Sequence, residues 1–163
     1  MADKPSKRKF YPKIDRQKIV HSRFLLTVSP NRKESHYDGG LDELKRRLAV
    51  CFRVLEKKDT ASKFIYILDK KSDMSNIKAV SCEWAVEKGA RSIWHGHALF
   101  VISHNTRVRM SFPVYKSFAC KALGISSCYF NAKLLPKDTA STLADVKEYI
   151  NKAQIPPAKD GKE

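Results

Sequence analysis

The chain has 163 residues, enough to bury the core of one domain, and no apolar run in it approaches the roughly 20 residues that a transmembrane helix needs. Its 32 Lys and Arg against 17 Asp and Glu give a formal net charge of +15, which favours polyanionic partners, nucleic acid above all. The N-terminus lacks an apolar signal core and the four cysteines show no Cys-x-x-Cys spacing, so we expect an intracellular protein with reduced thiols and no membrane partner.

The two ends of the chain differ in composition from the rest. Residues 1–20 are basic and without periodicity, which predicts a flexible basic arm before a folded domain over residues 21–155. Residues 156–163 are polar and predict a disordered tail. The arm contains a run of three basic side chains, Lys7, Arg8 and Lys9. This run suits contact with phosphates or nuclear import, and a solvated tail explains it equally well.

The middle of the chain alternates between strand-like and helix-like patterns. Runs rich in β-formers predict five strands, over residues 23–29, 63–68, 77–87, 93–103 and 126–134. Apolar residues at helical spacing predict three helices, over residues 41–57, 111–123 and 142–153. The resulting order β-α-β-β-β-α-β-α predicts an α+β domain, with a five-stranded, mainly antiparallel sheet and flanking helices.

The fourth predicted strand carries two histidines separated by a single glycine. Because residues two apart in a strand point to the same face, His95 and His97 are expected to project side by side. Two imidazoles need a third ligand to hold a divalent metal well, and the preceding strand offers Glu83 and Glu87. These two carboxylates share a face, and the register of the turn decides which lies opposite the histidines. The alternative interpretation is a pair of half-buried strand histidines with no ligand.

The last predicted helix contains a tyrosine followed three residues later by a lysine. Tyr149 lies at the edge of the apolar stripe of this helix, and Lys152 lies one turn further on. A nearby ammonium favours the phenolate, so this pair suits attack on a phosphodiester that a metal has polarised. Asp145, one turn earlier, suits either contact with the metal or a capping role. Taken alone, Tyr149 is better explained as an ordinary tyrosine of an amphipathic helix.

Three segments in this order resemble the motifs of the HUH endonucleases, in particular the single-tyrosine Rep nucleases that initiate rolling-circle replication of small single-stranded DNA viruses, plasmids and related transposons. Residues 24–31 (Phe-Leu-Leu-Thr-Val-Ser-Pro-Asn) are similar to the first motif, a strand running into a polar loop. His95-Gly96-His97 is similar to the second motif, and Tyr149-Ile150-Asn151-Lys152 matches the third. Residues 128–133 are similar to the strand that precedes the third motif, so the resemblance covers about residues 23–153.

The resemblance implies an RRM-like topology and an enzyme that nicks single-stranded DNA at an origin, a terminal hairpin or a transposon end. In this family the tyrosine attacks the phosphate, leaves a free 3′ hydroxyl and forms a reversible 5′-phosphotyrosine link. Tyr149 then corresponds to the nucleophile and Lys152 to the lysine beside it. His95 and His97 correspond to the metal pair, and the family's acidic ligand favours Glu87 over Glu83. The expected metal is Mn²⁺ or Mg²⁺, with Zn²⁺ as the alternative.

The chain departs from the family pattern in two ways. Gly96 replaces the usual hydrophobic residue between the histidines, which is expected to loosen the packing behind that strand. No Gly-x-x-x-x-Gly-Lys-[Ser/Thr] motif occurs, so any helicase is expected to be a separate protein or to belong to a longer chain. The expected location is the host nucleus for a viral or eukaryotic protein and the cytoplasm otherwise.

The basic surface is expected to hold the DNA backbone, with Lys133 beside the site as one contact. The main competing hypothesis is a non-catalytic RRM-like binding module, in which Tyr66, Trp94 and Tyr129 would stack on bases. A zinc-stabilised structural domain is disfavoured because the cysteines do not pair at ligand spacing.

Overall fold

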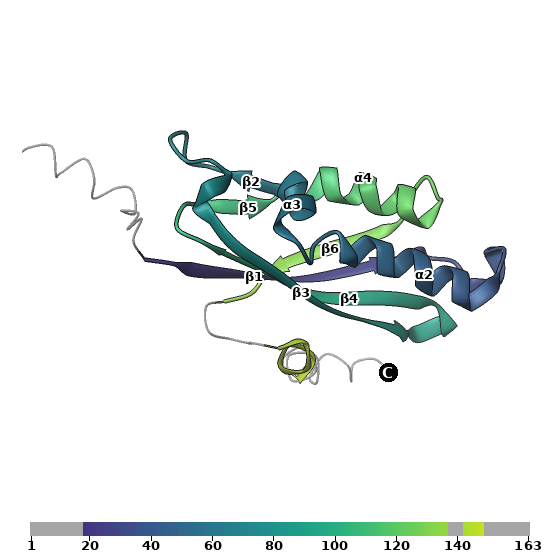
Figure 1. Cartoon of the computed structure of the whole chain (residues 1–163). Helices are drawn as coiled ribbons and strands as arrows, with labels where there is room; N and C mark the ends of the chain where they lie inside the picture. The colour runs from purple at the N-terminus through teal and green to yellow at the C-terminus, as the bar shows by residue number, and fades with distance from the viewer. Residues whose placement is uncertain (1–17, 137–141, 149–163) are drawn as a thin grey trace, which may run out of the picture.

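Four antiparallel strands form the main sheet in the computed structural model, which describes residues 18–136 and 142–148 (Figure 1). In spatial order these strands are β3 (Ile77–Lys88), β4 (Trp94–His104), β1 (Val20–Ser29) and β6 (Tyr129–Leu134). The two histidines therefore lie on a central strand, β4, which pairs with β3 on one side and with β1 on the other. The fold is α+β, as predicted. Within the described residues, no helix is long and apolar enough to cross a membrane.

The predicted strand over residues 63–68 does not join the main sheet, which corrects the expectation of one five-stranded sheet. A 3-10 turn at Ser62–Phe64 shortens it to β2 (Ile65–Ile67), which pairs instead with β5 (Val108–Met110) in a separate two-stranded sheet. β5 was not predicted, because a strand of three residues is too short to show a period of two. An ion pair between Asp69 and Arg107 links the two segments just beyond the last strand pair, Ile67 with Val108.

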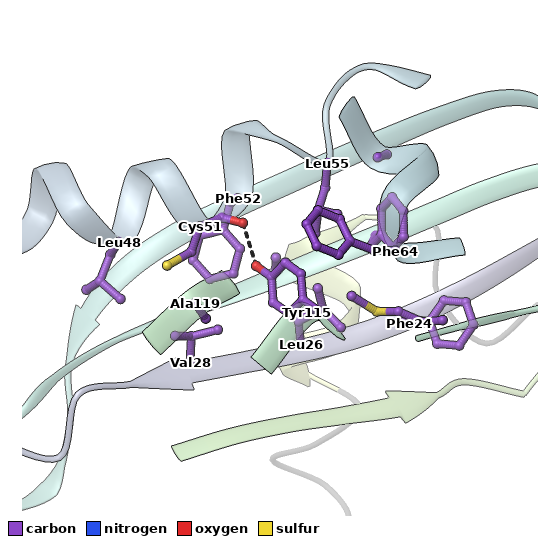
Figure 2. Packing of buried hydrophobic residues seen from close by; sticks show 14 of the residues in the cluster. Phe24, Leu26, Val28, Leu48, Cys51, Phe52, Leu55, Phe64, Tyr115 and Ala119 are labelled. Atoms are coloured by element: carbon purple, nitrogen blue, oxygen red, sulfur yellow. Dashed lines mark hydrogen bonds between the residues drawn. The ribbon is translucent and has the colours of Figure 1, made fainter. Parts of the chain in front are cut away.

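The helices α2 (Gly40–Arg53) and α4 (Phe112–Leu123), with the short α3 (Lys58–Ala61), cover one face of the main sheet (Figure 1). α2 ends at Arg53, four residues before the predicted Lys57, and its apolar stripe packs into the core on the covered face of the sheet, as its spacing predicts. Figure 2 shows Leu48 and Phe52 of α2 facing Leu26 and Val28 of β1. The buried Tyr115 of α4 donates a hydrogen bond to the carbonyl of Cys51, which joins the two helices (Figure 2).

Within the described part of the chain, four 3-10 turns occur in the connecting segments, at Glu34–His36, Ser62–Phe64, Met74–Asn76 and Ala90–Ser92. The sheet strands differ from their predicted bounds only at their ends: β1 begins at Val20, inside the range predicted for the arm, and β6 begins at Tyr129 rather than residue 126. Residues 1–17 and 156–163, which hold most of the predicted arm and all of the predicted tail, lie outside the described residues.

The opposite face of the sheet carries the first part of the predicted C-terminal helix, residues 143–148 (Figure 1). Leu143 and Val146 pack there against Leu25 of β1 and Leu99 of β4, in a second, smaller cluster of buried side chains. The hydroxyl of Thr142 accepts a hydrogen bond from the amide of Asp145, as an N-cap residue does. Residues 149–153 of the predicted helix lie outside the described residues.

Packing behind Gly96 is close, which corrects the expectation that this glycine loosens the strand. The ring of Phe52, fully buried, occupies the space where a side chain at position 96 would lie, and it stacks on Trp84 at 5.9 Å between ring centroids. A Cβ atom built at position 96 would lie 2.4 Å from Cε2 of Phe52. The lack of a side chain at Gly96 therefore leaves the space that the ring of Phe52 on α2 fills.

We predict that Gly96→Ala lowers the free energy of unfolding by about 1–3 kcal/mol, the usual cost of overpacking a core. Urea denaturation of the purified variant measures this change. In a Phe52→Leu background, Gly96→Ala is expected to lower the free energy of unfolding by clearly less, because leucine leaves part of the space beside position 96 empty. An equal cost in both backgrounds contradicts this explanation.

Candidate metal-binding site

The register of the β3–β4 hairpin decides which glutamate lies beside the histidines. Glu87 pairs directly with His95, whereas Glu83 pairs with Leu99, four residues further along β4. The hairpin turn closes with a hydrogen bond from the Gly89 amide to the Ile93 carbonyl, 2.8 Å. Gly89 is needed there, because a Cβ at that position would lie 2.6 Å from Cε1 of His95. The turn thus sets the register that brings Glu87 to the histidines.

Glu87, His95 and His97 form the one group of potential metal ligands found among the described residues. One ligand atom from each lies within 4.8 Å of the other two, and all three side chains are partly buried. The Nε2 atoms of the two histidines are 2.9 Å apart, and their rings meet at 80°. At this distance one ring nitrogen can donate a hydrogen bond to the other, and both lone pairs can also reach one cation.

The donor set fits a divalent cation. With metal–nitrogen bonds of about 2.1 Å, two nitrogens at a right angle lie about 3.0 Å apart, and at a tetrahedral angle about 3.4 Å apart. The 2.9 Å between the two Nε2 atoms is short enough for both nitrogens to reach one divalent ion, and it is equally the length of a hydrogen bond between the rings. One carboxylate and two imidazoles also leave coordination positions for water or a phosphate oxygen.

Two neighbouring side chains contact these potential ligands. Thr27 of β1, the cross-strand partner of His97, places its Oγ1 3.1 Å from Nδ1 of that ring. When Nδ1–H donates to the hydroxyl, Nε2 is left as the acceptor that a metal requires. Lys147 forms an ion pair with Glu87 across the gap to the C-terminal helix.

The pKa values of two ligands are shifted toward the forms that bind metal. The hydrogen bond from Lys147, aided by the positive charges nearby, lowers the pKa of Glu87 below its usual value. Burial, together with the adjacent His95, lowers the pKa of His97. The carboxylate is therefore ionised and the imidazole neutral near pH 7, which are the protonation states of metal ligands.

We predict that Thr27→Val weakens Mn²⁺ binding by about 10- to 100-fold, the usual cost of losing a hydrogen bond that orients a ligand. Valine keeps the shape of the side chain, so the thermal stability is expected to change little. The matched control is Ser22→Ala, which removes a similar hydroxyl–imidazole contact to His104 at the other end of β1, 2.8 Å long. Equal Mn²⁺ affinity in the two variants, measured by titration calorimetry, contradicts the role of Thr27.

Glu83, the alternative ligand, has a different role in the structure. Its Oε1 accepts a hydrogen bond of 2.9 Å from the amide of Leu143, so it holds the start of the C-terminal helix against the sheet. Asp145 is likewise outside the ligand cluster, and its amide binds the Thr142 hydroxyl.

Comparison of Glu87→Ala with Glu83→Ala separates the two carboxylates. We predict that Glu87→Ala lowers Mn²⁺ affinity by at least about tenfold, because it removes the one anionic ligand. Glu83→Ala is expected to keep the Mn²⁺ affinity and to lose about 0.5–2 kcal/mol of stability, as the loss of a helix cap does. Titration calorimetry and urea denaturation of both variants provide the test, and the reverse pattern contradicts the assignment.

The remaining predicted site residues fall into two groups. Lys133 lies on β6, exposed, opposite Leu25 and on the same sheet face as the histidines. The others lie outside the described residues: Tyr149, Lys152, Lys7, Arg8 and Lys9. Sequence reasoning missed Thr27 and Lys147, since only strand pairing and helix docking bring them to the cluster.

The three aromatic residues of the binding-module hypothesis do not share one surface. Tyr66 belongs to the separate β2–β5 ribbon. Trp94 alternates with His95 along β4 and lies under Lys45 of α2, on the helix-covered face. Tyr129 alone of the three lies on the face of the histidines, at the start of β6.

An open hollow of about 360 Å³ is lined by both histidines, and Glu87 is not among its lining residues. Its walls come from the end of β1, the β3–β4 turn and the start of β6. The two histidines therefore border a space open to a ligand, while Glu87 is paired with Lys147.

Comparisons of the chain with models of known protein families, with curated proteins and with solved structures found no match. The function is therefore inferred from the residues and their geometry.

Proposed function

We propose that the chain is a metal-dependent endonuclease of the HUH type, which nicks single-stranded DNA through Tyr149 and can rejoin the strands. The observation that carries this proposal is the cluster of Glu87, His95 and His97 on a sheet face where the C-terminal helix also docks. Lys147 of that helix pairs with Glu87, and Tyr149 follows it by two residues in the sequence. The metal ligands and the helix that leads to the tyrosine thus belong to one side of the sheet.

The arrangement of the main sheet supports the finer fold assignment, an HUH/Rep-type, RRM-like topology. The histidine motif lies on a central strand, the first motif lies on the strand beside it, and the strand before the tyrosine motif forms the edge. The first two motifs and the strand that resembles the one before the third motif therefore lie on neighbouring strands, although they are far apart in the sequence.

Glu87, His95 and His97 would hold Mn²⁺ or Mg²⁺, because one carboxylate and two imidazoles leave coordination positions open for water or a phosphate oxygen. The ion would supply Lewis-acid polarisation of a phosphate oxygen. Lys147 keeps Glu87 ionised, and Thr27 keeps the Nε2 lone pair of His97 available.

In the reaction, the phenolic oxygen of Tyr149 forms a bond to phosphorus while the bond from phosphorus to the 3′ oxygen breaks. The phenol gives up its proton, and the departing 3′ oxygen takes one up, so a 3′ hydroxyl and a 5′-phosphotyrosine result. The ammonium of Lys152 favours the phenolate. Attack of a 3′ hydroxyl on the phosphotyrosine reverses these steps and rejoins the strand.

The termini of the cleaved DNA test this proposal. A pool of single-stranded DNA, labelled at the 5′ end in one sample and at the 3′ end in another, is incubated with Mn²⁺ or with EDTA. The proposal predicts Mn²⁺-dependent cleavage that frees the 5′-labelled fragment with a 3′ hydroxyl and leaves the 3′-labelled fragment attached to protein. Release of both fragments from the protein contradicts the tyrosine mechanism. Tight, salt-sensitive binding without cleavage favours the non-catalytic binding module instead.

A further inference from the structure

The hollow beside the histidines has the chemistry of a nucleotide subsite. Thr27, Ser29 and His97 lie along one side of it, and Tyr129 and Arg91 lie among its other walls. The hollow thus combines an aromatic ring, hydroxyl groups and a guanidinium. The base of a nucleotide can stack on the aromatic ring and form hydrogen bonds with the hydroxyl groups. The phosphate of the nucleotide can contact the guanidinium.

Tyr129 is an exposed aromatic residue on the edge strand of the main sheet. Its side chain is 47% exposed, although it lies in the sheet and pairs with Ser29 of β1. Further along the same edge strand, Asn131 and Lys133 are also exposed, and because they alternate with Tyr129 they share its face. Asn131 lies opposite Thr27, which in turn lies opposite His97. A row of polar and aromatic side chains therefore runs from the ligand cluster to the edge of the sheet.

Three residues with unfavourable backbone conformations lie in or beside this hollow. Asn31, Arg91 and Ser92 have φ values of 57°, 63° and 59°, and they are the only non-glycine residues with positive φ among residues 18–136 and 142–148. Asn31 and Arg91 line the hollow, and Ser92 lies between two lining residues of the hairpin turn. Such conformations are unfavourable for L-residues and are often kept at ligand sites.

We propose that this hollow binds the nucleotide that adjoins the cleaved phosphate, with its base stacked on Tyr129 and its backbone phosphate held by Arg91. The proposal deepens the proposed nuclease function and rests on it for the identity of the ligand as single-stranded DNA. The C-terminal helix covers the sheet face over Leu25 and Leu99, so the open path for a strand crosses from the histidines over Thr27 toward β6. Tyr129 is the aromatic side chain on that path.

Binding in EDTA tests the subsite without requiring cleavage. The probe is a short, fluorescently labelled single-stranded DNA pool of random sequence, and fluorescence anisotropy gives the dissociation constant. Tyr129→Leu is expected to weaken binding by about 5- to 150-fold, the range for the stacking of one base on an aromatic side chain. Tyr129→Phe keeps the ring and is expected to bind as the parent chain does.

Tyr66→Leu is the matched control, because Tyr66 is 49% exposed and lies in a strand of the other sheet. This variant is expected to bind DNA with unchanged affinity. Thermal melting of each variant shows that it is folded, and leucine at position 129 keeps a β-compatible apolar side chain. Parent-like binding by Tyr129→Leu, or an equal loss in Tyr66→Leu, overturns the proposal.

The salt dependence separates the two contacts. Arg91→Gln is expected to reduce the slope of log affinity against log salt by about one, as the loss of one phosphate contact does. Tyr129→Leu is expected to leave this slope unchanged, since stacking releases no counterions. An unchanged slope in Arg91→Gln overturns the phosphate role of that residue. Tyr129-dependent binding by a chain that never cleaves DNA supports the subsite while contradicting the nuclease.

Discussion

The His97→Ala variant is expected to nick single-stranded DNA about 10²- to 10³-fold more slowly than the parent chain in Mn²⁺. The reason is that His97 is the ligand with the most support around it: its ring contacts His95, Thr27 holds its Nδ1, and burial keeps it neutral. Losing it removes several kcal/mol of charge stabilisation at the phosphate, which corresponds to this range of rates. A single-turnover nicking assay measures the effect.

His21→Ala is the control for this experiment. His21 lies on the neighbouring strand β1, is exposed and hydrogen-bonds to Ser103, far along the strand from the ligand cluster. Its removal is expected to leave the nicking rate within about twofold, as surface substitutions usually perturb stability little. Unchanged Mn²⁺-dependent nicking by His97→Ala means that the two histidines are structural.

The second large effect is expected for Tyr149→Phe, which removes only the attacking oxygen. The covalent adduct with DNA is expected to fall below detection, because no other group of the variant replaces the lost nucleophile. Binding of single-stranded DNA in EDTA is expected to stay unchanged, since phenylalanine keeps the ring. Denaturing gels detect the adduct, and anisotropy measures the binding.

Tyr66→Phe serves as the matched control for Tyr149→Phe, because it removes a hydroxyl from an exposed tyrosine of the β2–β5 ribbon. This control is expected to form the adduct at the parent rate. An adduct that persists in Tyr149→Phe assigns the attack to another residue and contradicts the proposed mechanism.

The ligand cluster illustrates how much the sequence alone predicts. The alternation of a strand places His95 and His97 on one face, and this needs no knowledge of the rest of the fold. The choice between Glu83 and Glu87 depended on the register, which the turn at residues 88–92 sets through two consecutive left-handed residues, Arg91 and Ser92. Such conformations are rare outside glycine and leave no sequence pattern, so both glutamates stayed open from the residues alone.

The same limit explains why sequence reasoning missed β5 and the pairing of β2, which was predicted as a strand of the main sheet. β5 and β2 have three residues each, and their pairing joins segments more than 40 residues apart, which local periodicity does not report. The fit of Phe52 against Gly96 is also a tertiary contact, between α2 and a central strand. By contrast, the long apolar stripe of α2 and the glycine that ends α4 (Gly124, φ 69°) are local signals, and both were predicted.

The charged neighbour of the cluster, Lys147, also could not be predicted from the sequence alone. Lys147 belongs to a helix 60 residues from Glu87 in the sequence, and only the docking of Leu143 and Val146 brings them together. A basic chain holds many lysines, so the sequence does not single this one out.

The covalent link between Tyr149 and DNA can be detected by incubating the chain with labelled single-stranded DNA in Mn²⁺ and in EDTA and running a denaturing gel. A labelled protein band that withstands SDS is expected with Mn²⁺ and not with EDTA. The band is expected to be absent in the Tyr149→Phe variant and to form about 10²- to 10³-fold more slowly in the His97→Ala variant. The absence of any such band from a broad pool of sequences, with tight binding of the same DNA, contradicts the nuclease.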